Sequence, residues 1–109
     1  MGETIEQILS RASDLHRRGD VGEAEDLYRF VLDNDPGNAD ATNLLGVLAS
    51  DQGYHEEAVE LIGQAIERQP DNPYYLFSLG NAFLCQDLFE DAEHCYRQSL
   101  DLDPKIGRA

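Results

Sequence analysis

Five side chains of this sequence, three histidines and two cysteines, belong to the types that most often do chemistry in proteins. Cys85 and Cys95 have neither a CxxC arrangement nor another spacing typical of a metal site. The segment 33–37, DNDPG, resembles the start of a calcium loop, but its glycine comes one place too early and no glutamate closes the loop. No glycine-rich loop suited to phosphate is present. These patterns predict a protein that is not an enzyme and that needs no metal and no cofactor.

The charge of the chain narrows the choice of partners. Twenty-two acidic residues face eight basic ones, which gives a net charge of −14. Such a surface repels polyanions, so we expect no nucleic-acid partner and no anionic membrane, whereas a basic or apolar protein segment is easier to accommodate. No apolar run approaches the ~20 residues of a membrane-spanning helix, and the N-terminal MGETIEQ is unlike a secretory signal. Together with the two cysteines, these features favour a cytoplasmic protein.

A period of 34 residues organises the whole chain. Pro36, Pro70 and Pro104 follow one another at this spacing, each within a short turn-like segment. Alignment on this period gives three rows, 5–38, 39–72 and 73–106, which we interpret as three repeats of one domain covering residues 1–109.

The rows agree in columns that predict paired helices. Small residues occupy the eighth position (Ala12, Gly46 and Gly80) and the twentieth (Ala24, Ala58 and Ala92). Apolar residues recur at i, i+3 and i+4 around them, so each row contains two helical segments with one buried stripe each. The small residues should allow the two helices of a row to approach closely, and stacked rows should bury a shared core.

The ends of the expected helices also carry recognisable signals. Gly19 and Gly53 can end a helix in a left-handed conformation, and Asn72 before Pro73 reads as a helix N-cap. Two further pairs, Thr4 with Gln7 and Asp20 with Glu23, resemble capping boxes. The histidines His16, His55 and His94 fall at different positions of the period, so we do not expect them to converge on a metal.

These columns resemble the tetratricopeptide repeat (TPR), a family of 34-residue helix–turn–helix units. Row three is the best match, through Leu79, Gly80, Ala92, Tyr96 and Pro104. The resemblance implies an all-α, right-handed α-solenoid of six antiparallel helices without a clear C-terminal capping helix. It also implies a concave groove, lined by the first helix of each repeat, that binds a peptide or a helix of a partner protein.

The resemblance assigns the groove to fixed positions of each repeat. The candidate partner-binding residues are Leu9, Ser13, His16, Asn43, Val47, Ser50, Tyr74, Phe77, Asn81 and Leu84, with Glu6 and Asp40 at matching positions. Our hypothesis is that Tyr74, Phe77 and Leu84 hold apolar side chains of the partner. Asn43 and Asn81 would bond its backbone. The alternative is that Phe77 or Leu84 packs against a neighbouring helix.

Two rival functions remain open besides a free-standing interaction module. The chain is similar to the N-terminal arrays of bacterial glycosyl-, sulfo- and methyltransferases, so it could be the docking part of a larger enzyme. It is also similar in fold and acidity to the small chaperones of type III secretion. The last helix would leave Cys95, Leu100 and Leu102 partly uncovered, which predicts either a missing neighbour or a homo-oligomer.

Overall fold

The fold is a row of three helical hairpins, as the repeat pattern predicts. The computed structural model describes residues 2–106; Met1 and residues 107–109, at the two ends of the predicted domain, lie outside the described residues. The helices are α1 (Ile5–Arg17), α2 (Val21–Asn34), α3 (Ala39–Asp51), α4 (His55–Arg68), α5 (Pro73–Leu84) and α6 (Phe89–Leu102). Residues 2–106 contain no β-strand, so the predicted all-α solenoid is confirmed.

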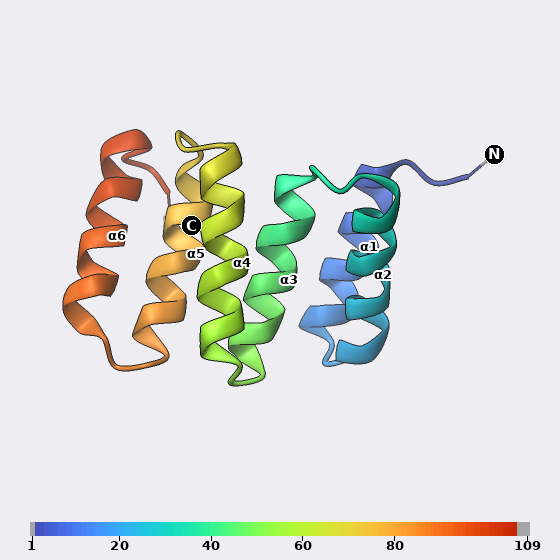
Figure 1. Ribbon diagram of the computed structural model, residues 1–109, viewed down its shortest axis with the longest axis horizontal. Helices are drawn as coiled ribbons and strands as arrows, with labels where there is room; N and C mark the ends of the chain where they lie inside the picture. The colour runs from blue at the N-terminus through green and yellow to red at the C-terminus, as the bar shows by residue number, and fades with distance from the viewer. Residues whose placement is uncertain (1, 107–109) are drawn as a thin grey trace.

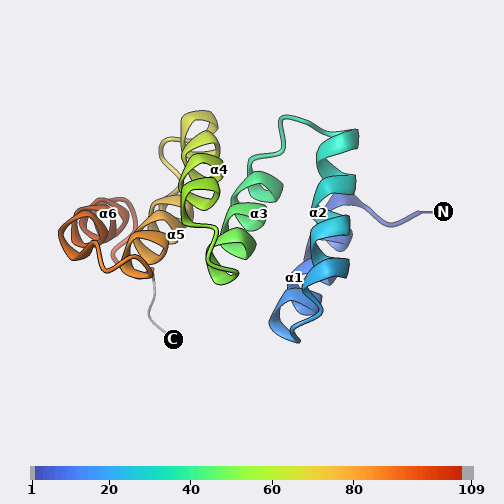
Figure 2. The same cartoon turned by 60° about the horizontal axis from the view of Figure 1, so that its bottom comes forward.

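The hairpins lie side by side along the long axis of a body that measures 45 × 27 × 26 Å. The α1–α2 hairpin lies at one end and the α5–α6 hairpin at the other, with α3 and α4 between them (Figure 1). The same order is seen after a 60° rotation (Figure 2). Besides its partner within each hairpin, α2 packs on α3 and α4 on α5, and the first helices contact each other from repeat to repeat. Helix α3 therefore has neighbours on most sides.

Close helix contact depends on the small residues that the columns predicted. Ala12, Ala24 and Ala58 have no exposed surface. A Cβ atom built on Gly46 would lie 2.8 Å from Ile62 Cγ1, and one on Gly80 would lie 2.6 Å from the Tyr96 ring. Real Cβ contacts are longer than this, so an alanine at Gly46 would press on packed side chains and backbone, and one at Gly80 would displace the Tyr96 ring.

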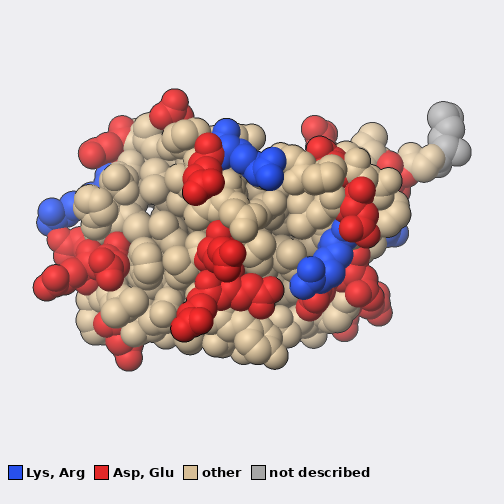
Figure 3. All heavy atoms as spheres, in the orientation of Figure 1, with Lys and Arg blue, Asp and Glu red and all other residues tan. Residues whose placement is uncertain are grey.

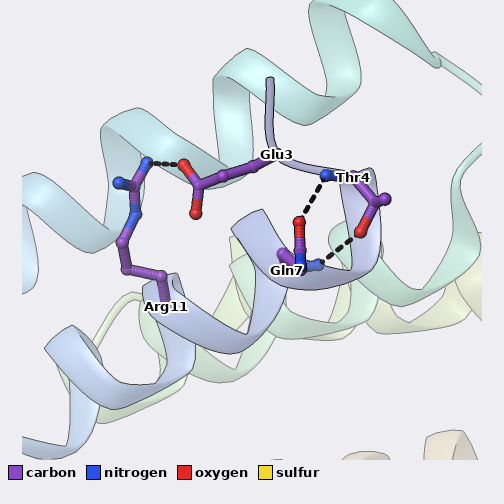
Figure 4. A network of polar contacts seen from close by, with 4 residues as sticks. All are labelled: Glu3, Thr4, Gln7 and Arg11. Atoms are coloured by element: carbon purple, nitrogen blue, oxygen red, sulfur yellow. Dashed lines mark hydrogen bonds and ion pairs between the residues drawn. The ribbon is translucent and has the colours of Figure 1, made fainter. Parts of the chain in front are cut away.

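The helix ends are capped by side chains near them in sequence. Thr4 and Gln7 form a reciprocal capping box at the start of α1, and Arg11 forms an ion pair with Glu3 at 2.9 Å (Figure 4). Asn38 and Asn72 accept N–H bonds at the starts of α3 and α5. The expected capping box at Asp20 is wrong, because this side chain forms no cap bond and its backbone is not extended as in a usual N-cap.

The turns within the hairpins use a left-handed residue at the same column of each repeat. Gly19 and Gly53 both have φ of +88°, as predicted, while Asp87 takes the third position with φ of +59°. Only glycine adopts this conformation freely, and aspartate tolerates it better than most other residues do. The third turn is therefore the most strained of the three.

The larger cluster of buried apolar residues lies between the first hairpin and α3. Tyr28, Tyr75, Leu48 and Ile62 are the largest side chains that are fully buried. At the far end, Leu100 and Leu102 are each 44% exposed, whereas Cys95 is only 4% exposed. The expectation that Cys95 is uncovered is wrong, because the α5–α6 hairpin itself covers it; self-association through α6 stays a prediction.

Candidate functional site: a pocket between α1, α3 and α5

A pocket of about 400 Å³ lies where α1, α3 and the first turn of α5 meet. The lining residues share the inward faces of the first helices of the repeats: Glu6, Leu9, Ser10, Ser13, Asp40, Asn43, Leu44, Asn72, Tyr74 and Tyr75. On α1 the spacing is i, i+3, i+4 and i+7, which places these side chains on one face of the helix. Neighbouring repeats thus supply one wall each.

Four of the predicted groove residues, Leu9, Ser13, Asn43 and Tyr74, line this pocket. Leu9 forms part of the apolar core beneath it, while Tyr74 is 62% exposed at its edge. The aromatic ring of Tyr74 is thus available to a ligand without any rearrangement of the core.

Asn43 is the most unusual group in the pocket. Its side chain is only 7% exposed, and its Oδ1 atom has no hydrogen-bond partner. An unsatisfied buried carbonyl oxygen costs on the order of 1–3 kcal/mol in free energy of folding. The oxygen has almost no accessible surface of its own, so a ligand would reach it only after a small shift of the pocket wall.

Asp40 lies one turn before Asn43 on α3 and is bonded across the repeat boundary. The Tyr75 O–H donates to Asp40 Oδ1. Burial, and then this bond with Asp40, raise the pKa of Tyr75. The tyrosine therefore stays protonated as a donor, and it holds one carboxylate oxygen in place while the other remains able to accept bonds.

The wall formed by α1 is tied to its own hairpin. Ser13 Oγ lies 3.4 Å from the Tyr28 hydroxyl oxygen, and burial raises the pKa of Tyr28. His16 lies further along α1, outside the pocket. Its Nε2 is 2.6 Å from Asp51 Oδ2 at the end of α3. His16 thus joins the first repeat to the second. The other two predicted groove residues on α3 are less accessible, since Val47 is half-buried and Ser50 is buried.

The predicted residues on the rest of α5 are arranged differently. The Phe77 ring packs on Tyr96 of α6 with ring centroids 5.4 Å apart, as the alternative interpretation of Phe77 proposed. Asn81 Oδ1 accepts the Tyr96 O–H at 2.5 Å. Leu84 is exposed. One lone pair of the Asn81 oxygen is therefore already used by Tyr96. The side-chain N–H groups of Asn81 remain candidates for a bond to a partner's backbone.

The surface of the protein is acidic as a whole. On the face drawn in Figure 3, which α2 and α4 share, acidic groups are spread along the length of the molecule with fewer basic groups among them. No Lys or Arg lines the pocket. In residues 2–106, no three His, Cys, Asp or Glu side chains are grouped so as to hold a metal ion. None of the helices in the described part of the chain has the length and apolarity needed to cross a membrane.

Sequence reasoning gave Asp40 and Glu6 as groove positions but did not find Tyr75 or the role of Tyr96. Both cross-repeat bonds, His16–Asp51 and Asp40–Tyr75, join residues 35 apart, which is one period plus one residue. A search for polar pairs at that spacing could have found them.

The fold and the shared groove define a helical repeat protein of the α-solenoid class. Family models described as tetratricopeptide repeat match residues 15–79 and 73–106. The chain belongs to the tetratricopeptide repeat family, as the sequence columns predicted.

Several proteins are similar to nearly the whole chain. A TPR repeat-containing protein of Pseudomonas aeruginosa is 35% identical over 94% of the chain, which covers 18% of that protein. The protein O-mannosyl-transferase TMTC1 of Mus musculus is 29% identical over 93% of the chain and 11% of its own length. A structure of Thermobaculum terrenum O-GlcNAc transferase has 29% identity and a TM-score of 0.87 over 97% of the chain and 21% of that structure. The chain thus spans about a fifth or less of the length of these relatives.

Proposed function

We propose that this chain is a non-catalytic protein-interaction module that binds a peptide or helical segment of a partner in the concave groove. The three rows 5–38, 39–72 and 73–106 would act as one binding domain. TPR units are interaction modules, which supports the general function, and the two free thiols of Cys85 and Cys95 fit a cytoplasmic location.

The observation that carries the proposal is the unbonded Oδ1 atom of Asn43 in a pocket edged by an exposed tyrosine. Monomeric proteins satisfy most buried polar groups within the chain. A partner backbone N–H that reaches Asn43 would satisfy this oxygen, while Tyr74 would cover an apolar part of the partner. The remaining predicted groove residues would extend the contact along α3 and α5.

The test is a selection of random linear peptides displayed on phage, followed by affinity measurement with two matched variants. Tyr74→Ala removes a 62% exposed ring at the pocket, whereas Tyr54→Ala removes a 60% exposed ring at the turn before α4, outside this pocket. We expect Tyr74→Ala to weaken binding about tenfold or more, since buried aromatic anchors dominate interfaces, and Tyr54→Ala to leave it unchanged. Equal effects of the two substitutions would contradict groove binding.

A second candidate function is supported by the transferase resemblance. The chain matches 21% of the O-GlcNAc transferase structure, which is a small part of that protein. In this case the module would dock substrate proteins for a catalytic domain encoded in the same reading frame. Sequencing of the complete reading frame decides the matter, because a transferase domain in it supports docking and a frame without one excludes it.

A further inference from the structure

Three acceptor groups belong to residues that line the pocket. Glu6 and Asp40 contribute carboxylates from the first turns of α1 and α3, and Asn43 contributes the unbonded oxygen. Asp40 and Asn43 are three residues apart on one helix, so both face the same space. No cationic side chain lines the pocket to neutralise these groups.

We propose that this pocket binds the guanidinium group of an arginine side chain carried by the partner segment. This inference rests on the proposed function and deepens it by naming the chemistry that the groove selects. The guanidinium would donate to the Asp40 carboxylate and to Asn43 Oδ1, with Glu6 adding charge from the opposite wall. It would turn one face toward the Tyr74 ring.

The sign of the local field supports a cation even though helix N-termini lie nearby. The N-terminus of a helix carries roughly half a positive charge, which falls off within the first turn. Here the first turns of α1 and α3 each contain a full negative charge, and Thr4, Asn38 and Asn72 already accept N–H bonds from the ends of α1, α3 and α5. The net charge of −14 further favours a basic ligand.

Arginine fits this arrangement better than lysine does. Guanidinium presents several N–H donors in a fixed plane and stacks on aromatic faces, whereas an ammonium group is a compact and strongly hydrated point charge. A planar fork would offer separate donors to the acceptors on α1 and α3. The exposed Tyr74 ring supplies the stacking surface.

The experiment is a titration of the ¹⁵N-labelled protein with N-acetyl-arginine amide, followed by NMR. N-acetyl-citrulline amide, which has the same shape without the charge, and N-acetyl-lysine amide are the comparison ligands. We expect saturable shifts of the Asn43 side-chain amide and of the Tyr74 backbone N–H with arginine. Affinity should be about tenfold weaker with citrulline, because charge-assisted bonds would be lost, and intermediate with lysine.

Two variants and a matched control locate the effect. Asp40→Asn keeps an oxygen for the Tyr75 bond but removes the charge, and Glu6→Gln does the same on α1 without touching a cross-repeat bond. Each should weaken arginine binding severalfold or more, while Asp101→Asn on the exposed face of α6 should not. If Asp40→Asn lowers the melting temperature, Glu6→Gln alone carries the test. Equal affinity for citrulline, or an equal loss in Asp101→Asn, overturns the proposal.

Failure of arginine binding can be distinguished from failure of groove binding. Peptides selected on the protein that depend on Tyr74 but show no enrichment of arginine would overturn this inference and leave groove binding intact. Peptides that bind without any dependence on Tyr74 would contradict groove binding. The titration with capped arginine would still decide the inference by itself, because it requires no partner.

Discussion

The surface formed by α1, α3 and α5 has two halves, and they differ in whether their polar side chains are bonded within the protein. In the first half, formed by α1, α3 and the start of α5, the Asn43 oxygen has no partner and Tyr74 projects freely. In the second half, the rest of α5 is tied to α6, because Tyr96 both packs on Phe77 and bonds Asn81. Equivalent positions of one repeat pattern can therefore be either open to a ligand or closed by the protein itself.

One pair of columns illustrates how the repeats differ. Ser13 with Tyr28, Val47 with Ile62, and Asn81 with Tyr96 occupy the same two positions of successive repeats. Where the second position is tyrosine, its hydroxyl group meets the polar side chain of the first helix. Where it is Ile62, the second helix offers no hydroxyl group to the first, and the Asn43 oxygen on that first helix has no partner.

The largest change in the free energy of unfolding is expected at Gly46, where α3 and α4 pack closely. Gly46→Ala brings a Cβ against Ile62, Leu61 and the backbone oxygen of Ala58, none of which can move freely. Overpacking costs typically about 1–3 kcal/mol, partly offset by the better helix propensity of alanine. We expect a net loss of about 1–2 kcal/mol in the free energy of unfolding, measured with urea.

Gly80→Ala is the matched substitution in the second half. Its Cβ meets only the ring of Tyr96, a half-buried side chain that can swing aside. The expected loss is below about 1 kcal/mol, together with loss of the contact between the Tyr96 hydroxyl and Asn81. A larger loss at Gly80 than at Gly46 would show that the second half is the more rigid one.

A smaller effect, of opposite sign, is expected at the strained turn of the third hairpin. Asp87→Gly relieves a left-handed aspartate and should raise the free energy of unfolding by about 0.5–1 kcal/mol. The reverse exchange, Gly53→Asp, should lower it by a similar amount at the corresponding turn. Thermal unfolding of the two variants checks both values, and a destabilised Asp87→Gly protein would argue for a role of the aspartate side chain.

The smallest change in stability is expected for Tyr96→Phe, which frees the Asn81 oxygen in the second half of the surface. It removes the bond to Asn81 Oδ1 at a cost of about 0.5 kcal/mol, the low end of the usual range, since the bond is exposed and neutral. The ring contact with Phe77 remains possible. In NMR spectra the Asn81 side-chain amide should shift while that of Asn43 stays unchanged; a shift of both would mean that the two halves are coupled.

The sequence was sufficient for the periodic part of the structure. The 34-residue spacing, the glycines at Gly46 and Gly80, and the turns at Gly19 and Gly53 follow from local steric rules that act in the same way in each repeat. The position of Asp87 could have been read from its column, 34 residues after Gly53. The capping box expected at Asp20 failed because sequence spacing alone does not fix the backbone angle of the cap.

The contacts between repeats could not be predicted in the same way. The bonds His16–Asp51 and Asp40–Tyr75 depend on the angle at which one hairpin stacks on the next. This angle is a sum of many packing contacts, so the sequence offers polar pairs at a spacing of 35 as candidates without showing which of them bond. Four residues of the pocket were predicted from their repeat positions, whereas the pocket itself and the unbonded Asn43 oxygen were found in the structure.

The most direct test of an open first half is to locate bound arginine by intermolecular nuclear Overhauser effects. The protein is saturated with N-acetyl-arginine amide, and contacts from the arginine δ-protons to aromatic rings are recorded. If the first half is the open one, contacts appear to the ring of Tyr74 and none to those of Phe77 or Tyr96. Contacts to Phe77 or Tyr96 without contacts to Tyr74 would contradict an open first half.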